Sequence, residues 1–325
     1  MKAKPLTIAA AAVVAFCVSL FVLSGCGQTR SDRPRVKIVA TTFPVYDWTR
    51  EVLGDRLSET DLVLLQQSGA DLHSYSPSAA DLRQIAACDL FVFVGGESDE
   101  WTERALAQKG NPRRRVLNLG KNVECKMENG ECEAAVDSGS ARHNGHGHEM
   151  DEHVWLSLRN AAIFVKAIAS ELGAIDPENA NTCHANADAY CAKLVALDGE
   201  YTKVVSGAKR RTLLVADRFP FRYLADDYGL EHFAAFAGCS AESEASFKTI
   251  AFLAQKVDEL KLPVIVTTEG ADHKIAETVR RTTQAKDQRI LALDSLQSIG
   301  GEAAKTTHYL DVMRRNLETL KAILN

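Results

Sequence analysis

The chain has 325 residues, of which 46% are hydrophobic and 25% are charged, with a mean hydropathy of -0.14. This composition is typical of a folded soluble protein and excludes a disordered, collagen-like or polytopic membrane protein. At about 150 residues per domain, the length predicts about two domains. The net charge of -5 and a longest basic run of only three residues, at 113–115, argue against a nucleic-acid partner.

The N-terminal segment has the pattern of a secretion signal that ends in a lipidation site. Two lysines precede an apolar run over residues 6–23, and a lipobox-like Leu-Ser-Gly-Cys follows at Cys26. We therefore expect a signal peptide over residues 1–25, diacylglycerol on Cys26, and a polar tether over residues 26–35. The mature protein would be lipid-anchored on the outer face of the bacterial cytoplasmic membrane. The alternative is an uncleaved anchor helix with an incidental cysteine.

The first half of the mature chain alternates apolar runs with helical periodicity. Runs rich in β-branched residues indicate strands, and apolar residues at three- and four-residue steps indicate helices. Residues 121–152 lose this periodicity and are expected to form a surface loop. The alternation predicts a parallel sheet within an N-terminal α/β lobe over residues 36–175. Strands are expected at 36–42, 62–65, 90–94 and 116–119, and helices at 46–53, 79–87 and 100–107.

A long linker helix over residues 176–206 is predicted to join this lobe to a second one. Asp176 and Pro177 suit the N-cap and the first helical position, and an apolar stripe follows. Residues 207–325 repeat the alternation and predict a C-terminal α/β lobe. Its strands are expected at 212–216, 232–236, 263–268 and 290–293, and its helices at 221–228 and 247–260. The predicted fold class is therefore α/β, with two doubly wound parallel-sheet lobes joined by one long rigid helix.

The cysteines fit an exported protein. Cys125 and Cys132 flank a polar stretch and are compatible with a local disulfide in an oxidising setting. Cys183 and Cys191 share the predicted long helix, where eight residues span about 12 Å, too far for a bridge. We expect these two to be core thiols.

Two histidines lie in motifs that resemble those of a known family. His73 lies in GADLHSYSPSAADL after a predicted strand, and His153 lies in DEHVWLSLRNA at the end of the predicted loop. With VATTFPVYDW and the later LDSL, these motifs make nearly the whole mature chain resemble the cluster A-I lipoproteins. These proteins, also called the bacterial solute-binding protein 9 family, are the metal-binding receptors of zinc and manganese ABC importers. The order and spacing of His73, His153 and Asp294 match the family motif.

The resemblance implies a metal site in the cleft between the lobes, with ligands from both. His73 and His153 would serve from the first lobe, and Asp294, after the last strand, fits the family's fourth ligand. Neutral imidazoles and carboxylates suit a d-block cation. The family's third ligand, His or Glu, follows the first strand of the second lobe, but alignment of that segment puts Arg218 there. A guanidinium has no acceptor and cannot bind a cation.

Another side chain has to replace the third ligand. The candidates at strand ends of the second lobe are Glu269, which we favour, and Asp217. In doubly wound order, the strands ending in Asp217, Glu269 and Asp294 lie side by side, so either carboxylate could reach the metal. Arg218 would then pair with the other one. The remaining alternative is a structural ion pair with Arg218 and a site of three protein ligands completed by water.

A short, acidic, histidine-rich run lies next to His153 and contains His143, His146 and His148. Such tracts are candidate metal binders. In zinc members of the family that this chain resembles, a longer histidine-rich loop occupies this place. We therefore interpret the run as a shortened metal-capture loop that favours zinc, with an ordinary solvated loop as the alternative. The remaining histidines are interpreted as surface or structural: His184, His232, His273 and His308.

The sequence thus predicts a transport protein with no catalytic residues. We expect it to bind Zn2+, with Mn2+ next, as cargo and to deliver it to the membrane subunit of an ABC permease, acting as a monomer. One alternative is a surface-anchored zinc-dependent hydrolase, but the chain has no His-Glu-x-x-His or Gly-x-Ser-x-Gly motif. The other alternative is a metal-binding adhesin.

Overall fold

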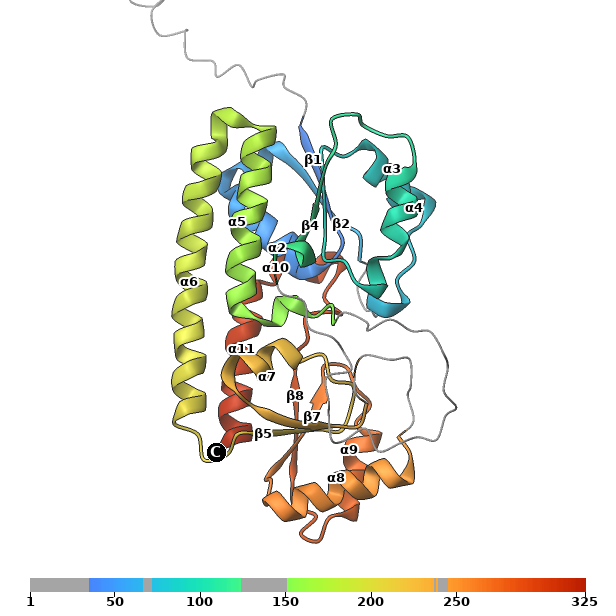
Figure 1. Ribbon diagram of the computed structural model, residues 1–325, viewed down its shortest axis with the longest axis vertical. Coiled ribbons are helices and arrows are strands. Elements are labelled where there is room, and N and C mark those ends of the chain that lie inside the picture. The colour runs from blue at the N-terminus through green and yellow to red at the C-terminus, as the bar shows by residue number, and fades with distance from the viewer. Residues whose placement is uncertain (1–34, 67–71, 124–150, 237, 239–244) are drawn as a thin grey trace, which may run out of the picture. The chain divides into compact units, whose positions relative to one another are not determined.

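The computed structural model describes residues 35–66, 72–123, 151–236, 238 and 245–325. Residues 36–325 form one compact unit, distinct from residues 1–35. Its strands build two parallel sheets, each with helices on both faces (Figure 1). Within the described ranges, no helix combines the length and the apolar character needed to cross a membrane.

The first sheet has four parallel strands in the order β2-β1-β3-β4. Helices α3 and α4 cover one face, and α2 and α5 cover the other (Figure 1). This arrangement confirms the doubly wound sheet expected for the first lobe. The strands are β1 (Val36–Ala40), β2 (Thr60–Leu64), β3 (Leu90–Phe93) and β4 (Arg115–Asn118), and the helices are α2 (Phe43–Leu53), α3 (Ala79–Ala87), α4 (Trp101–Ala107) and α5 (Leu158–Ile175).

Neighbouring residues of the central strands enter different cores, because successive side chains of a strand point to opposite faces of the sheet. In β1, Ile38 packs on the side of α2 and α5, whereas Val39 packs under α3 and α4. In β3, Leu90 and Phe91 divide in the same way. The central strands are thus buried on both faces, which explains their continuous apolar sequences.

One long helix, α6 (Ala180–Ser206), follows the first lobe; its 27 residues extend about 40 Å. The long helix expected here is therefore present, and Asp176 is the N-cap residue of the helical segment with Pro177 after it, as expected. Pro177–Asn179 form a short 3-10 turn before α6, and Asp176 makes no side-chain cap. Its carboxylate instead lies 2.6 Å from Arg56 and accepts a hydrogen bond from the Asn179 side chain at 3.0 Å.

Cys183 and Cys191 are buried, unpaired thiols on α6. This confirms the expectation of core thiols at these two positions. The disulfide expected between Cys125 and Cys132 concerns positions outside the described residues.

The second sheet repeats the pattern in the order β6-β5-β7-β8. Because β5, β7 and β8 are neighbours and parallel, their carboxyl ends lie side by side at one edge, as the sequence predicts. Helices α8 and α9 pack on one face of this sheet. The strands are β5 (Thr212–Val215), β6 (Glu231–Ala234), β7 (Val264–Thr268) and β8 (Arg289–Leu293), and the helices are α7 (Arg222–Tyr228), α8 (Phe247–Leu260), α9 (Lys274–Thr282), α10 (Gly301–Thr306) and α11 (Tyr309–Leu324).

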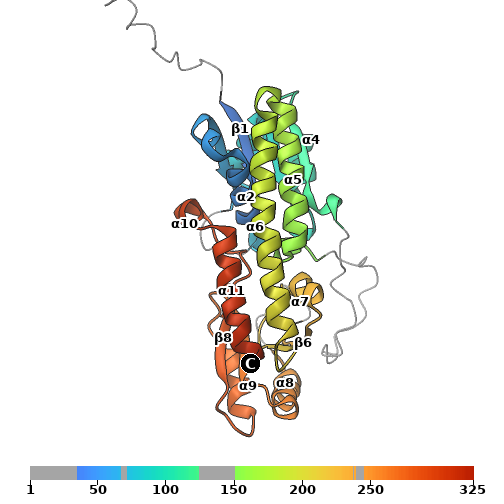
Figure 2. The same cartoon turned by 90° about the vertical axis from the view of Figure 1, so that its left-hand side faces the viewer.

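The C-terminal helix α11 packs on α6 and reaches α2 of the first lobe (Figure 2). The Tyr201 hydroxyl in α6 donates to the Met313 carbonyl at 2.6 Å, and the Tyr309 hydroxyl donates to the Trp155 carbonyl at 2.6 Å. One hydrophobic cluster contains side chains of β1 and α5 together with side chains of β5, β7 and α11. The two lobes therefore share a continuous core beside the long helix.

Candidate metal centre

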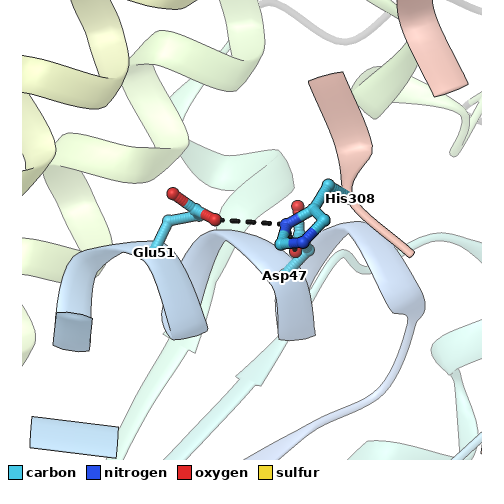
Figure 3. A group of neighbouring side chains, drawn as sticks. All are labelled: Asp47, Glu51 and His308. Atoms are coloured by element: carbon cyan, nitrogen blue, oxygen red, sulfur yellow. Dashed lines mark ion pairs between the residues drawn. The ribbon is translucent and has the colours of Figure 1, made fainter. Parts of the chain in front are cut away.

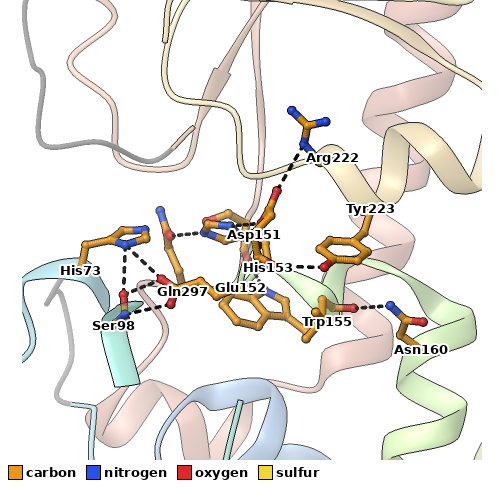
Figure 4. Close-up of polar contacts among 12 residues, drawn as sticks. His73, Ser98, Asp151, Glu152, His153, Trp155, Asn160, Arg222, Tyr223 and Gln297 are labelled. Atoms are coloured by element: carbon orange, nitrogen blue, oxygen red, sulfur yellow. Dashed lines mark hydrogen bonds and ion pairs between the residues drawn. The ribbon is translucent and has the colours of Figure 1, made fainter. Parts of the chain in front are cut away.

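His153 lies directly before the 3-10 segment Val154–Leu156 and is only 1% exposed. Its Nδ1 lies 2.8 Å from Asp151 Oδ1, which also accepts the His153 backbone N–H at 2.9 Å. Because a carboxylate only accepts hydrogen bonds, Nδ1 carries a proton, which leaves Nε2 as the nitrogen that could bind a cation. Nε2 faces Gln297 Oε1 of the second lobe at 3.3 Å (Figure 4).

His73 lies in the short 3-10 segment Leu72–Ser74, and its side chain is 23% exposed. Its Nδ1 is 3.1 Å from Glu152 Oε1 and 3.0 Å from Ser98 Oγ. Ser98 in turn fixes Glu152, to which it donates its backbone N–H at 3.0 Å and its hydroxyl at 2.5 Å. Burial by itself raises the pKa of Glu152, but the hydrogen bond from His73 and the charges of both histidines bring that pKa below its ordinary value. Glu152 is therefore ionised and holds Nδ1 of His73.

The rings of His73 and His153 lie beside each other, with centroids 5.5 Å apart. The adjacent residues Asp151 and Glu152 serve different rings, since Asp151 holds His153 and Glu152 holds His73 (Figure 4). Such carboxylate partners fix the tautomer and orientation of metal-binding histidines. Both imidazoles thus offer Nε2 to a cation. Neither carboxylate was predicted from the sequence, although two acidic residues directly before a candidate ligand are a usable signal.

Glu269 and Asp294 follow β7 and β8, which are neighbouring strands. Glu269 accepts hydrogen bonds from the Ser295 backbone N–H at 2.8 Å, the Ser295 hydroxyl at 2.6 Å and the Ser298 hydroxyl at 3.0 Å. Asp294 Oδ1 accepts the Leu296 N–H at 2.8 Å. Burial raises the pKa of both carboxyls, and the charge of Asp294 raises the pKa of Glu269 further. The two groups are therefore close enough to repel each other when both are ionised.

Asp217, the alternative ligand, follows β5, and its carboxylate already accepts hydrogen bonds from neighbouring residues. Its carboxylate accepts the Thr268 backbone N–H at 3.1 Å, the Thr268 hydroxyl at 2.6 Å and the Arg218 backbone N–H at 2.8 Å. The hydrogen bonds with Thr268 connect the end of β5 to the end of β7. The expected pairing of the Arg218 guanidinium with a carboxylate stays a prediction.

Residues of both lobes enclose the histidine segment. Trp155 Nε1 donates to the Ser295 carbonyl at 2.8 Å, and the Tyr223 hydroxyl donates to the Asp151 carbonyl at 2.9 Å. Arg222 Nε lies 3.8 Å from Asp151 Oδ2 (Figure 4). The candidate ligands of the first lobe are thus joined to the loop after β8 and to α7 of the second lobe.

The predicted ligands do not gather into one tight cluster. In the described part of the chain, one group of His, Cys, Asp and Glu side chains offers three ligand atoms within 4.8 Å of one another: Asp47, Glu51 and His308 (Figure 3). Arg50 forms an ion pair with Asp47 and lies 3.1 Å from His308 Nδ1. Since the guanidinium already supplies a cation, we interpret this group as an ion-pair cluster between α2 and the segment before α11.

Four of the predicted functional residues lie outside the described residues. They are the lipidation site and the three histidines of the capture loop: Cys26, His143, His146 and His148. Their assignments stay predictions from the sequence.

Asp99 is a buried carboxyl next to Ser98, and its Oδ2 accepts the N–H groups of Val94 at 3.0 Å and Gly95 at 2.9 Å. Burial raises the pKa of Asp99 to about 7; the backbone hydrogen bonds oppose this shift, and the charge of Glu152 adds to it. The folded chain therefore keeps this proton at pH values where the unfolded chain, with a pKa of about 3.9, has lost it. The folded state therefore binds one more proton than the unfolded chain in this range, and the free energy of unfolding falls as the pH rises from about 4 to about 7.

Asp99→Asn is expected to remove this pH dependence while keeping an oxygen acceptor for both N–H groups. Between about pH 5 and about pH 8, the wild type should lose on the order of 2 kcal/mol of unfolding free energy relative to the variant. Urea unfolding of both proteins in EDTA measures the difference at each pH. A difference that is the same at both pH values would contradict the shifted pKa.

Known proteins are similar to this chain over most of its length. The family described as zinc-uptake complex component A, periplasmic, matches residues 38–323. The chain belongs to this family. It is 32% identical over 309 residues to the zinc-binding lipoprotein AdcA of Streptococcus pneumoniae, covering 95% of this chain and 60% of AdcA. It is 30% identical over 313 residues to the high-affinity zinc uptake system protein ZnuA of Bacillus subtilis, covering 95% of each.

The architecture is also that of solved relatives. The crystal structure of the Zn(II)-bound ZnuA-like domain of pneumococcal AdcA matches with a TM-score of 0.70 and 29% identity, over 89% of this chain and 99% of that one. The chain spans about 60% of the length of whole AdcA. The family is described as a component of a zinc-uptake complex. Neither this description nor the names of these relatives point to a hydrolase.

Proposed function

We propose that this protein binds Zn2+ outside the cytoplasmic membrane and delivers it to the membrane subunit of an ABC permease. The observation that carries the proposal is the pair of histidines, His73 and His153, each held by its own carboxylate beside residues of the second lobe. Membership of the zinc-uptake component A family supports the same role. Imidazole suits Zn2+ well, whereas Mn2+ prefers oxygen ligands, so Mn2+ is the second choice of cargo.

We assign the metal ligands to His73, His153, Glu269 and Asp294, with Asp217 as the alternative to Glu269. The repulsion between Glu269 and Asp294, expressed in the raised pKa of Glu269, supports this choice because a shared cation would relieve it. The contacts of Asp217 with Thr268 give that carboxylate a structural role instead.

The same proposal includes a lipid anchor on Cys26, action as a monomer, and metal capture by His143, His146 and His148. Relatives that are named lipoproteins support the anchor and a place on the outer face of the membrane.

The adhesin alternative is separated from uptake by the growth of a deletion strain in zinc-depleted medium. Unimpaired growth there would favour adhesion over transport.

Glu269→Gln is expected to weaken zinc binding about as much as Asp294→Asn, by about tenfold or more in Kd. Each change removes one anionic oxygen from the metal. Asp217→Asn should cost clearly less, because its carboxylate holds Thr268. Competition with a chromophoric chelator gives the Kd, and mass spectrometry of protein purified without added metal gives the native cargo.

Glu302→Gln is the matched control, because it removes the same charge from an exposed side chain of the second lobe. It should leave the Kd unchanged. If Asp217→Asn costs more than Glu269→Gln, the ligand is Asp217, and Arg218→His should then partly rescue the Asp217→Asn site. Zinc binding that none of the three carboxylate changes weakens would refute this ligand set.

A further inference from the structure

An ion pair on α2 of the first lobe contacts the connection between α10 and α11 of the second lobe. Arg50 forms this pair with Asp47. The Arg50 guanidinium also donates to the carbonyls of Ala304 at 3.1 Å, Lys305 at 2.8 Å and Thr307. A helix leaves its last carbonyls without partners of its own. Arg50 therefore supplies donors to the carboxyl end of α10.

The other member of the ion pair caps α11. Asp47 Oδ2 accepts the backbone N–H of Tyr309, the first residue of α11, at 2.7 Å. His308, at the N-cap position, makes no side-chain cap of its own and lies beside Asp47 (Figure 3). Negative charge is favourable at a helix N-terminus and positive charge at a C-terminus, so each charge faces the helix end that suits it. The first lobe thus caps two helices of the second.

The capped residue Tyr309 connects this ion pair to the candidate metal centre. Its hydroxyl donates to the Trp155 carbonyl at 2.6 Å. The Trp155 indole donates to the Ser295 carbonyl at 2.8 Å and lies against the His153 ring, with ring centroids 5.2 Å apart. Ser295 directly follows Asp294. A continuous series of hydrogen bonds and packed rings therefore joins α2 to one proposed ligand and to the neighbour of another.

These contacts oppose movement of the second lobe away from the first. Asp47 is completely buried, and the Arg50 side chain is only 11% exposed. Movement of the connection away from α2 would break the contacts with both charges and leave the first N–H group of α11 without its acceptor. The segment between Asp294 and Tyr309 is therefore held at both ends, by β8 in the second lobe and by α2 in the first.

We propose that Asp47 and Arg50 act together as positioning residues that slow the release of bound Zn2+, because they hold the segment after β8 against the first lobe. This inference rests on the proposed function. Neither residue belongs to the proposed ligand set, so their loss should speed dissociation of the metal while leaving its ligands in place. A merely structural role would lower the free energy of unfolding and leave the dissociation rate unchanged.

Stopped-flow mixing of the Zn2+-loaded protein with excess chromophoric chelator measures the dissociation rate. We expect Asp47→Asn and Arg50→Gln each to raise this rate by at least about threefold. Arg50→Lys should lie between the wild type and Arg50→Gln, because an ammonium keeps the charge but lacks the planar fork that reaches several carbonyls. Visible spectra of the Co2+-loaded variants should match that of the wild type, since the ligands stay in place.

A control and a double variant complete the series. Arg314→Gln removes an exposed arginine of α11 that pairs with Asp311 of the same helix at 3.2 Å, and it should leave the dissociation rate unchanged. The double variant Asp47→Asn/Arg50→Gln should raise the rate by clearly less than the product of the two single effects, because the two residues act as one unit.

Three results would overturn the proposal: a dissociation rate that neither single variant changes, single effects that multiply in the double variant, or an altered Co2+ spectrum. Urea unfolding in EDTA checks that each variant folds. If Arg50→Gln does not fold, Asp47→Asn decides, because it keeps an oxygen for the Tyr309 N–H. His153→Ala separates this inference from the proposed function: if only His153→Ala affects zinc binding, the positioning role fails, whereas an unaffected His153→Ala protein would refute the site itself.

Discussion

His153→Ala is expected to weaken zinc binding by at least about 100-fold, or about 2.7 kcal/mol. Loss of a residue that merely orients a metal ligand typically costs 10- to 100-fold, so loss of a buried ligand should cost no less. His153 is fully enclosed, and its Nε2 is the nitrogen available to a cation, so water cannot replace it without rearrangement. His73→Ala should have a smaller effect of at least about tenfold, because His73 is partly exposed. Competition titration with a zinc chelator measures both.

Two controls accompany these variants. His184→Ala removes an exposed histidine from α6 and should leave the Kd unchanged. Deletion of residues 142–148 removes three histidines of the predicted capture loop and should also leave the tight site intact. Equal losses from the deletion and from His153→Ala would mean that the tract itself is the primary zinc site.

Trp155→Ala is expected to lower the unfolding free energy by about 3–5 kcal/mol. The indole is completely buried, and its Nε1 donates to the Ser295 carbonyl of the second lobe at 2.8 Å. The substitution therefore leaves a large cavity in the shared core and an unpaired carbonyl next to it. Trp155→Phe keeps most of the volume and loses only the hydrogen bond, so it should cost about 1–3 kcal/mol. Urea unfolding in EDTA measures stability without metal.

Phe247→Ala is the matched control for Trp155→Ala. Phe247 lies at the start of α8 and is 91% exposed, so its removal should change stability by no more than about 0.5 kcal/mol. Similar losses for the two aromatic residues would show that Trp155 does not hold the lobes together. A cooperative transition that splits into two in Trp155→Ala would indicate that the lobes then unfold separately.

The sheets could be predicted from the sequence because their central strands are buried on both faces. Each such strand is a short apolar run between polar segments, so its position is visible without long-range information. Helix α9 was missed for a physical reason: only Ala276 and Val279 are buried in it, which leaves too little apolar periodicity. Helix α11 was also missed, although its apolar residues recur at three- and four-residue steps, and this signal was sufficient to find it.

The candidate site was only partly accessible to sequence analysis. The motifs around His73 and His153 identified these residues as candidates, and the structure places their rings side by side. The contact of Gln297 with His153 could not be found in this way, because the two residues are 144 positions apart and no local pattern marks it. The ligand proposed in place of Arg218 was equally hidden, since three carboxylates at neighbouring strand ends are equivalent in sequence. Only their hydrogen bonds distinguish them.

The residues that complete the shared core come late in the chain. Both histidines belong to the first half of the chain, whereas Asp294 and helix α11 come much later. A nascent chain therefore has the two imidazoles before it has the oxygen donors of the second lobe or the helix that fills the shared core. Two imidazoles without those donors hold a metal only loosely. We therefore expect a product that is cut short before α11 to lack both a complete core and tight zinc binding.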